Sequence, residues 1–289
     1  MPAKISLASV LPEKPSNYPG FWASVSKIKT FKTCPAKFKF NYIDKLPKKT
    51  CEFHTLGKFA HFNLEQFHLK RLAGDIRPDN VLMGECFREG IKEFQESLTR
   101  EQKDEVYEMM LKYLEKISGE RKSTGLPEVK AVEEEFYIDI DGKVMLMGFI
   151  DRVQIDPDGM LHVADYKTSK SKKYLAEDDF QLKTYAYVKC LQDPSIQKIR
   201  TSYIMLKHDF DYITFEFSRD EVMKIEDKFL SDAEVIQSEV LYRPETSPLC
   251  EYCDFVEHCP EGADFVEERK RKREEKNRKN ARAWGHQKW

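Results

Sequence analysis

The chain has 289 residues, of which 40% are apolar, 12% aromatic and 34% charged, and its formal net charge is −2. This composition excludes a disordered or fibrous protein, and the length fits one large domain or two small ones. No apolar run approaches the roughly 18 residues of a membrane span, and the proline-rich first 20 residues do not form a secretory signal. We therefore expect an intracellular protein, in the cytoplasm or another reducing compartment, with no membrane partner.

The first part of the chain carries helical signals. Prolines interrupt residues 1–23, which we expect to form an extended arm outside the folded domain. Apolar residues then recur at helical spacing, which predicts helices over 24–43, 56–72, 81–97 and 100–117. The dipeptide Cys34-Pro35 should interrupt the first of these helical segments.

The helix predicted over 100–117 has marked ends. Thr99 and Gln102 have the spacing of a capping box at its start, and Gly119 is expected to end it. The chain up to about residue 120 should therefore be largely helical.

The middle of the chain alternates strand and turn signals. Strands are predicted over 132–140, 143–155, 160–167, 199–206 and 212–217. Asp141-Gly142 is a strong hairpin signal, and residues 156–159 form a second predicted turn. Helices are predicted over 178–191 and 219–240. The resulting order is β-β-β-α-β with one added strand and a final helix.

Charged residues within the predicted strands point to metal chemistry. Asp165 and Lys167 are two apart, so a strand directs both side chains to one face. A hairpin can bring Asp151 beside Asp165, and two adjacent carboxylates call for a cation such as Mg²⁺. Lys167 could then orient or deprotonate a metal-bound water, or stabilise charge on a phosphate. Taken alone, Asp165 and Lys167 would be a surface ion pair.

Four motifs in chain order extend this pattern. They are Gly57-Lys58-Phe59-Ala60-His61, Gly148 to Arg152, Asp165-Tyr166-Lys167-Thr168 and Gln181-Leu182-Lys183-Thr184-Tyr185. Together they resemble the GxxxH, GxxD, D/E-x-K and QxxxY motifs of RecB-like nucleases in the PD-(D/E)XK superfamily. The resemblance covers about residues 24–260. It implies a restriction-endonuclease-like α/β fold, in which helices flank a central mixed sheet and a helical N-terminal and insertion region is added.

The resemblance also implies roles for the residues of the motifs. His61, Asp151 and Asp165 would bind a catalytic Mg²⁺ or Mn²⁺ ion, with the backbone carbonyl of Tyr166 as a further ligand. Lys167 would be the catalytic lysine, acting with Asp151 and Asp165. A minor departure from the family pattern is that Asp165 stands where Glu is commoner.

Two further residues match the family's substrate cleft. Gln181 and Tyr185 are four apart on one helical face and match the pair that lines the cleft beside the substrate strand. Gln181 could instead complete an N-terminal cap with Asp178. His61, taken alone, could be a satisfied core histidine on an aromatic-rich helix.

Four cysteines form a candidate metal site. Cys250, Cys253 and Cys259 are closely spaced, and the early Cys34 can supply a fourth ligand. Some RecB-like nucleases, among them AddB nuclease domains and CRISPR-associated exonucleases, join one early and three late cysteines around a [4Fe-4S] cluster. The resemblance thus implies an iron–sulfur clasp, with a tetrahedral zinc site as the alternative. The other cysteines, expected to be ordinary buried or half-buried thiols, are Cys51, Cys86 and Cys190.

Basic residues supply candidate DNA contacts. The expected phosphate contacts are Arg152, Lys170, Lys172 and Lys173. Residues 267–289 hold ten Lys or Arg and four Glu, so this segment carries +6 and the rest of the chain −8. It could be a partly disordered DNA-binding tail or a solvated helix with i,i+4 ion pairs.

These observations predict one nuclease domain over residues 24–266. It would contain a helical insertion near 73–128 and a cluster segment at 250–260. The implied function is a metal-dependent DNA exonuclease that hydrolyses phosphodiester bonds of single strands or duplex ends. Recombination, repair, or phage or CRISPR-related processing would be its setting, with a helicase or another recombination protein as partner. The alternatives are a catalytically silent DNA-binding or scaffold module of the same fold and a zinc-stabilised structural protein.

Overall fold

The computed structural model of the chain describes residues 8–48, 52–95, 97–177 and 179–285. The chain forms two compact units. Unit 1 is built from residues 1–25 and 51–234, and unit 2 from residues 26–50 and 235–289. Unit 2 therefore combines an early and a late segment of the chain.

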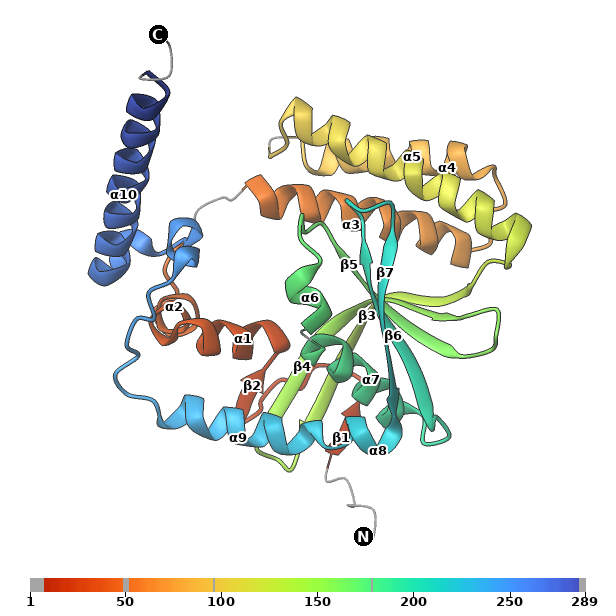
Figure 1. The fold of residues 1–289 in the computed structure, drawn as a ribbon. Helices are drawn as coiled ribbons and strands as arrows, with labels where there is room; N and C mark the ends of the chain where they lie inside the picture. Colours follow the sequence, from red (N-terminus) through yellow and green to blue (C-terminus); the bar gives the residue numbers. More distant parts are fainter. Residues whose placement is uncertain (1–7, 49–51, 96, 178, 286–289) are drawn as a thin grey trace. The chain divides into compact units, whose positions relative to one another are not determined.

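Unit 1 is organised around one mixed, mostly antiparallel sheet (Figure 1). Its seven strands within the described residues are β1 (Ala8–Leu11), β2 (Phe21–Ala23), β3 (Glu128–Ile140), β4 (Val144–Ile155), β5 (Leu161–Lys167), β6 (Lys198–Met205) and β7 (Asp211–Ser218). They follow the order β1-β3-β4-β5-β6-β7, and β2 pairs with β4. The pairs β5/β6 and β2/β4 are parallel, and the other pairs are antiparallel.

The predicted turns close the two hairpins that position the site. Asp141 and Gly142 have φ values of 56° and 65°, as the two central residues of a type I′ turn require, and Lys143 N donates to Ile140 O at 3.0 Å across this turn. Gly159, with φ of 82°, stands in the turn between β4 and β5. The strands predicted over 132–167 are thereby confirmed, with boundaries shifted by a few residues.

The predicted arm over residues 1–23 is partly wrong. Its residues 8–11 form β1, which pairs antiparallel with β3, and residues 21–23 form β2, which pairs with β4. Backbone hydrogen bonds to longer strands hold these two segments. Strands of three and four residues are too short to show the period-2 alternation by which a strand is detected.

Helices cover both faces of the sheet. They are α3 (Glu52–Leu72), α4 (Asp79–Glu93), α5 (Arg100–Ser123), α6 (Lys173–Glu177), α7 (Phe180–Gln192) and α8 (Arg219–Val222). Helix α3 packs on β3, and α4 and α5 pack on α3 (Figure 1), whereas α7 packs on β5 and β6. The buried cluster under α3 to α5 includes Phe59, Leu64, Met110 and Tyr166.

Two helix predictions differ from the structure. The capping box of α5 is present, since the Thr99 hydroxyl accepts from Gln102 N and Gln102 Oε1 accepts from Thr99 N. However, α5 continues through Gly119 to Ser123, because Gly119 lies on an exposed face where no contact opposes the helix. The helix predicted over 219–240 is divided into α8 and α9 (Ile225–Ser238).

Unit 2 contains α1 (Val25–Thr33), α2 (Pro35–Phe38), a π-helical turn (Lys39–Ile43), two 3-10 turns (Pro248–Tyr252 and Val256–His258) and α10 (Pro260–Gly285). The predicted break at Cys34-Pro35 is confirmed, because Cys34 caps α2 and Pro35 is its first residue. Aromatic rings from the two chain segments meet in this unit. Phe38 stacks on Tyr242 with centroids 6.3 Å apart, and Phe40 lies 6.0 Å from Phe255.

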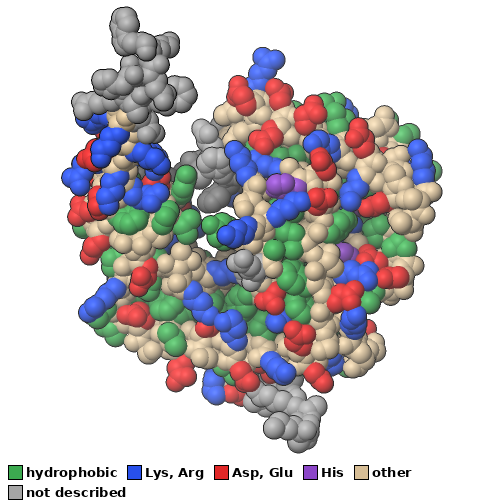
Figure 2. All heavy atoms as spheres, in the orientation of Figure 1, with side chains coloured by type: hydrophobic (Ala, Val, Ile, Leu, Met, Phe, Trp, Pro, Cys, Tyr) green, Lys and Arg blue, Asp and Glu red, His purple; other side chains and the backbone are tan. Residues whose placement is uncertain are grey.

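Helix α10 is strongly charged and mostly exposed over residues 267–279. Basic and acidic side chains are prominent on the part of this helix that Figure 2 shows in colour. The i,i+4 pairs Lys272–Glu268 and Arg278–Glu274 have N···O distances of 2.6 and 3.5 Å. The helical interpretation of residues 267–285 is therefore confirmed, and the last four residues lie outside the described part of the chain. None of the described helices is long and apolar enough to cross a membrane.

Candidate active site

The C-terminal end of β5 carries the central residues of the site. Period-2 alternation sends Tyr166 into the core under α3 and α5, while Asp165 and Lys167 share the opposite face. Asp165 is 2% exposed, and Lys167 Nζ lies 2.5 Å from its Oδ2. The predicted pairing of these two side chains is present; Asp165 is buried, and Lys167 is half-buried.

Gln181 of α7 connects the groups on this face. Its amide Nε2 donates to Asp165 Oδ1 and to Tyr185 Oη, both at 2.7 Å. Its Oε1 accepts from Lys167 Nζ at 3.1 Å. The alternative in which Gln181 completes an N-terminal cap with Asp178 involves a residue outside the described part of the chain. The Gln181 side chain makes the contacts given above, and the N-cap residue of α7 is Asp179.

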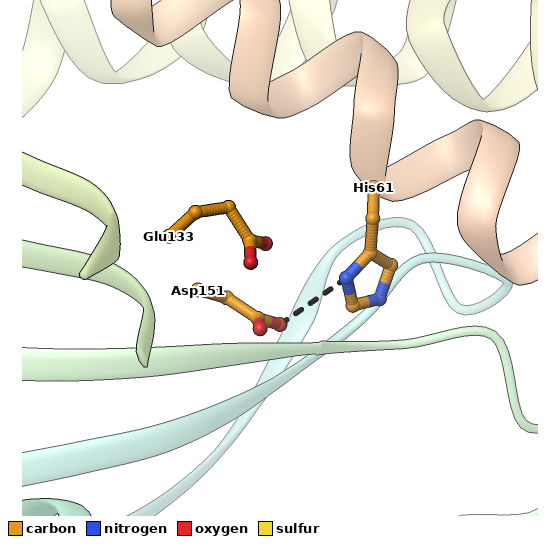
Figure 3. A group of neighbouring side chains, drawn as sticks. All are labelled: His61, Glu133 and Asp151. Carbon is orange, nitrogen blue, oxygen red and sulfur yellow. Dashed lines mark ion pairs between the residues drawn. The ribbon is translucent and has the colours of Figure 1, made fainter. Parts of the chain in front are cut away.

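His61 and Asp151 meet the backbone of Tyr166 from the neighbouring elements. His61 on α3 places Nε2 2.9 Å from Tyr166 O and Nδ1 3.4 Å from Asp151 Oδ2 (Figure 3). Asp151 Oδ2 also accepts from Tyr166 N at 2.8 Å. His61 is thus directed at the carboxylates and is not a core histidine.

Glu133 of β3 joins this group, and sequence reasoning missed it. His61, Glu133 and Asp151 each offer a ligand atom within 4.8 Å of the others (Figure 3). The register pairs Val132 with Arg152 and Glu134 with Ile150, which sets Glu133 opposite Asp151. A signal was available, because a run of three glutamates (133–135) breaks the apolar alternation of a strand.

When no cation is bound, the surroundings of this group favour the protonated form of its carboxylic acids. Burial and the neighbouring Asp165 raise the pKa of Asp151 well above its usual range. Burial, with Glu65 and Asp165 nearby, raises the pKa of Glu133 to about 7. Burial lowers the pKa of His61, so its imidazole is neutral at pH 7 and able to bind a metal.

The donor set fits a hard divalent ion. It combines carboxylate oxygens, one neutral imidazole and the Tyr166 carbonyl, which suit Mg²⁺ or Mn²⁺. Asp165 Oδ2 is buried and has no well-directed hydrogen bond among the described residues, although Lys167 is near. A divalent ion would give that oxygen a ligand bond in addition to its ion pair with Lys167. Asp165 lies outside the group of His61, Glu133 and Asp151, so its role as a ligand stays a prediction.

The structure corrects the prediction that Arg152 contacts DNA. Strand alternation places it on the face opposite Asp151, where it is 3% exposed and donates to Gln154 Oε1 and Tyr166 Oη. The three lysines after β5 are at the surface or partly exposed, and Lys172 pairs with Asp211 at 2.6 Å. DNA contact by Lys170, Lys172 and Lys173 stays a prediction.

The four predicted cluster cysteines line one small cavity within unit 2. Backbone N–H groups of Lys37 and Glu245 point to Cys34 Sγ at 3.4 Å. Two further bonds of this kind are Ser247 N to Cys250 Sγ at 3.4 Å and Gly262 N to Cys259 Sγ at 3.3 Å. Such donors stabilise thiolates, so the residues fit a metal site of four sulfurs.

The remaining cysteines within the described residues are buried thiols outside the candidate cluster site. Cys86 and Cys190 are fully buried in unit 1, as predicted, and burial raises the pKa of both thiols. Cys51 lies outside the described residues.

Comparison with known proteins adds a family match. The model of the family described as the PD-(D/E)XK nuclease superfamily matches residues 23–260. No curated protein shows a significant match to the chain. A solved structure described as "Crystal structure of SSO0001" is 16% identical, covers 86% of this chain and 89% of that chain, and has a TM-score of 0.36.

Proposed function

The chain belongs to the PD-(D/E)XK nuclease superfamily, and from this premise we propose that it is a metal-dependent DNA exonuclease of the RecB-like type. The observation that carries the proposal is the convergence of His61, Asp151 and the Asp165-Tyr166-Lys167 segment at the end of β5. An inactive scaffold would have no need to hold a half-buried lysine and several crowded acids together, since such a group is costly to keep.

Each side chain has a task that its contacts support. A divalent ion, when bound, would supply an activated water and stabilise charge on the scissile phosphate. Gln181 and Asp165 hold Lys167 Nζ, which can then move a proton or offset negative charge. Tyr185, bonded to Gln181, fixes the amide that orients Lys167.

Finer assignments follow from the motifs. The GxxxH and QxxxY motifs are features of RecB-like nucleases, which supports action on single strands or duplex ends. We place the enzyme in recombination, repair, or phage or CRISPR-related DNA processing, with a helicase or another recombination protein as partner.

Nuclease assays of matched variants test the function. Wild type, Lys167→Ala and the control Lys183→Ala, whose lysine pairs with Asp179 and Glu221, are incubated with end-labelled single- and double-stranded DNA. Linear and circular substrates are compared, with Mg²⁺, Mn²⁺ or EDTA. We expect wild type and Lys183→Ala to degrade linear DNA only with metal, and Lys167→Ala to be slower by about 10²-fold or more. Undiminished activity of Lys167→Ala contradicts the catalytic assignment, and cleavage of circles contradicts exonuclease action.

We further propose that Cys34, Cys250, Cys253 and Cys259 hold a [4Fe-4S] cluster. The N–H donors to their sulfurs and the early-plus-late spacing support it. Protein purified anaerobically should be brown and contain about four irons per chain. Colourless protein that contains zinc alone would favour the structural zinc site and refute the cluster.

A further inference from the structure

A second cavity lies in unit 1, away from the candidate active site. It has a volume of about 220 Å³ and is formed by α3, α5 and the sheet. Its walls include Phe67, His68, Tyr113, Phe210 and Tyr212. His68 stands seven residues after His61 on α3, which separates the cavity from the metal-binding group by about 10 Å along the helix.

Arg152 lines this cavity with a charge that no acid neutralises. It is 3% exposed, and it bonds to the neutral groups Gln154 Oε1 and Tyr166 Oη, the latter at 3.2 Å. Within the described part of the chain, its second terminal nitrogen has no hydrogen-bond partner and no carboxylate forms an ion pair with it. A buried guanidinium without a counter-ion is costly, so this position calls for an anion.

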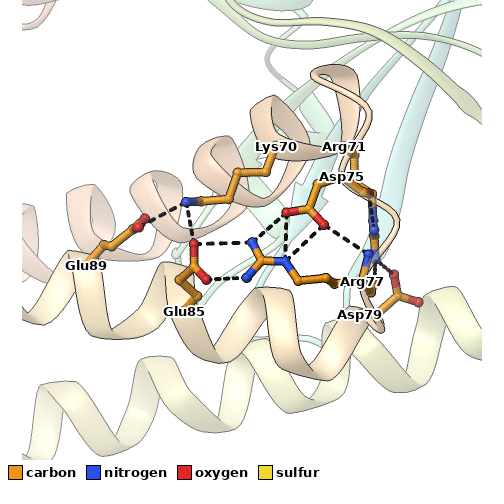
Figure 4. Close-up of polar contacts among 7 residues, drawn as sticks. All are labelled: Lys70, Arg71, Asp75, Arg77, Asp79, Glu85 and Glu89. Atoms are coloured by element: carbon orange, nitrogen blue, oxygen red, sulfur yellow. Dashed lines mark hydrogen bonds and ion pairs between the residues drawn. The ribbon is translucent and has the colours of Figure 1, made fainter.

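The opening of the cavity is also cationic. Among its described lining residues, Arg71, Lys116, Arg121 and Arg152 oppose two acids, Asp79 and Glu120. Asp79 is already shared by Arg71 at 2.5 Å and Arg121 at 2.8 Å, as Figure 4 shows for Arg71. Lys116 Nζ lies 3.5 Å from Glu120 Oε1 and over the ring of Tyr212, 4.9 Å from its centroid. The surplus of two positive charges favours entry of an anion.

We propose that this cavity binds a small organic anion, in which a phosphate or carboxylate pairs with Arg152 and an aromatic body packs against Tyr113 and Tyr212. The volume suits this ligand, since an apolar cavity of about 150 Å³ already accommodates benzene. A charge-assisted hydrogen bond from the guanidinium supplies the specificity, and the apolar walls supply burial.

Three probes that share one ring test the chemistry of the head group. Phenyl phosphate, benzoate and the neutral benzamide are titrated into the full-length protein and followed by calorimetry and by the melting temperature. We expect saturable binding and a higher melting temperature with phenyl phosphate, benzoate or both, and no response to benzamide. A response to phenyl phosphate alone assigns a phosphate ligand, and a response to benzoate alone assigns a carboxylate. No response to either anion, or an equal response to all three probes, overturns the proposal.

Variants locate the binding. Arg152→Met should abolish the response while leaving the ligand-free melting temperature unchanged or higher, because an unpaired buried charge is removed. Arg200→Met is the matched control, since Arg200 is fully paired with Asp156, Asp158 and Glu216; it should lower the melting temperature and keep the response. If Arg152→Met does not fold, Lys116→Glu at the opening should weaken binding at least tenfold. Unchanged affinity in Arg152→Met, or in Lys116→Glu, overturns the assignment.

Discussion

Glu133 has a φ of 47° in the middle of β3, a left-handed conformation that costs a non-glycine residue about 1–3 kcal/mol. The strained backbone sets its carboxylate beside Asp151 and His61. Strain that is retained at such a point indicates a functional demand on the side chain. Glu133 is therefore a candidate site residue that the structure identifies and the sequence patterns do not.

We predict that Glu133→Gln weakens the binding of the metal ion, so that the nuclease needs more Mg²⁺ for the same activity. The amide keeps the shape of the side chain and removes a negative charge from the group that would hold the ion. Activity at limiting Mg²⁺ should fall about tenfold or more and recover partly at high Mg²⁺, while the melting temperature changes little. A titration of activity against Mg²⁺ that coincides with wild type would contradict this role.

His68 should give unit 1 a pH-dependent stability. It is buried, 2.8 Å from the Tyr113 hydroxyl, and burial, with Arg152 and Arg71 nearby, lowers its pKa well below the usual value. The unfolded state, which titrates near pH 6.5, then binds the proton more readily. Stability is thus complete above about pH 6.5 and declines as the pH falls, by up to about 1.4 kcal/mol per pH unit.

Urea unfolding at pH 7.5 and 5.5 measures this effect. Wild type should lose about 1 kcal/mol more than His68→Phe over this interval. The difference between the two proteins removes the contribution of the other titrating groups. Equal losses would show that His68 is not responsible.

The predictability of the site depends on how each residue is positioned. That Asp165 and Lys167 share one face follows from strand alternation, and that Gln181 and Tyr185 share one follows from helical spacing, because both periods are local properties of the chain. The roles of these residues are implied by the family motifs and not by the periods. The contact of Glu133 depends on a backbone irregularity, which no periodicity reveals. A basic residue beside a catalytic motif suggests a phosphate contact, which is why the sequence predicts one for Arg152. Strand alternation instead directs the Arg152 side chain into the core.

At the level of elements, two helical glycines have opposite roles. A Cβ on Gly90 of α4 would lie 2.6 Å from Phe59 Cε2, and the ring of Phe59 is fully buried. A Cβ on Gly119 of α5 would meet nothing within 4 Å. Gly90 therefore permits the close packing of α4 on α3, while Gly119 only weakens its helix.

We predict opposite stability changes for Gly90→Ala and Gly119→Ala. Overpacking at Gly90 should destabilise the protein by about 1–3 kcal/mol. The alanine at Gly119 should stabilise it by about 0.5–1 kcal/mol through helix propensity. Chemical denaturation of both variants checks the signs, and two changes of the same sign would refute this account of the packing.

The elements differ in how strongly the sequence indicates them. Long helices and hairpin strands have strong signals in their periodicity and turn residues, as at Thr99 and Asp141-Gly142. The end of α5 is not at Gly119, since glycine marks a helix end only where the chain also turns, which happens at Gly125 with its φ of 86°. Short elements such as β1, β2 and α6 depend on tertiary contacts and leave little local trace.

For the whole molecule, the two units should lose structure separately when the cysteine site is broken. Cys34→Ser removes one of four proposed ligands from unit 2, whereas the interior of unit 1 is untouched. We expect faster amide exchange in residues 26–48 and 235–285 and unchanged protection in β3 to β5, measured by hydrogen exchange. Cys86→Ala, at a buried position in unit 1, should leave the exchange of unit 2 unchanged. Equal protection of unit 2 in Cys34→Ser and wild type would contradict the clasp.

Because unit 2 combines an early and a late segment of the chain, its proposed cluster ligands are synthesised at different times. Its early segment contains Cys34 and its late segment Cys259, and translation adds about 5–20 residues per second. Cys34 is therefore made roughly 10 to 45 s before its last partner, and for that interval it has no complete site. The strands of unit 1 are all translated before then, so the sheet can form first. A chain truncated before Cys250 would contain every strand of unit 1 and only one of the four proposed cluster cysteines.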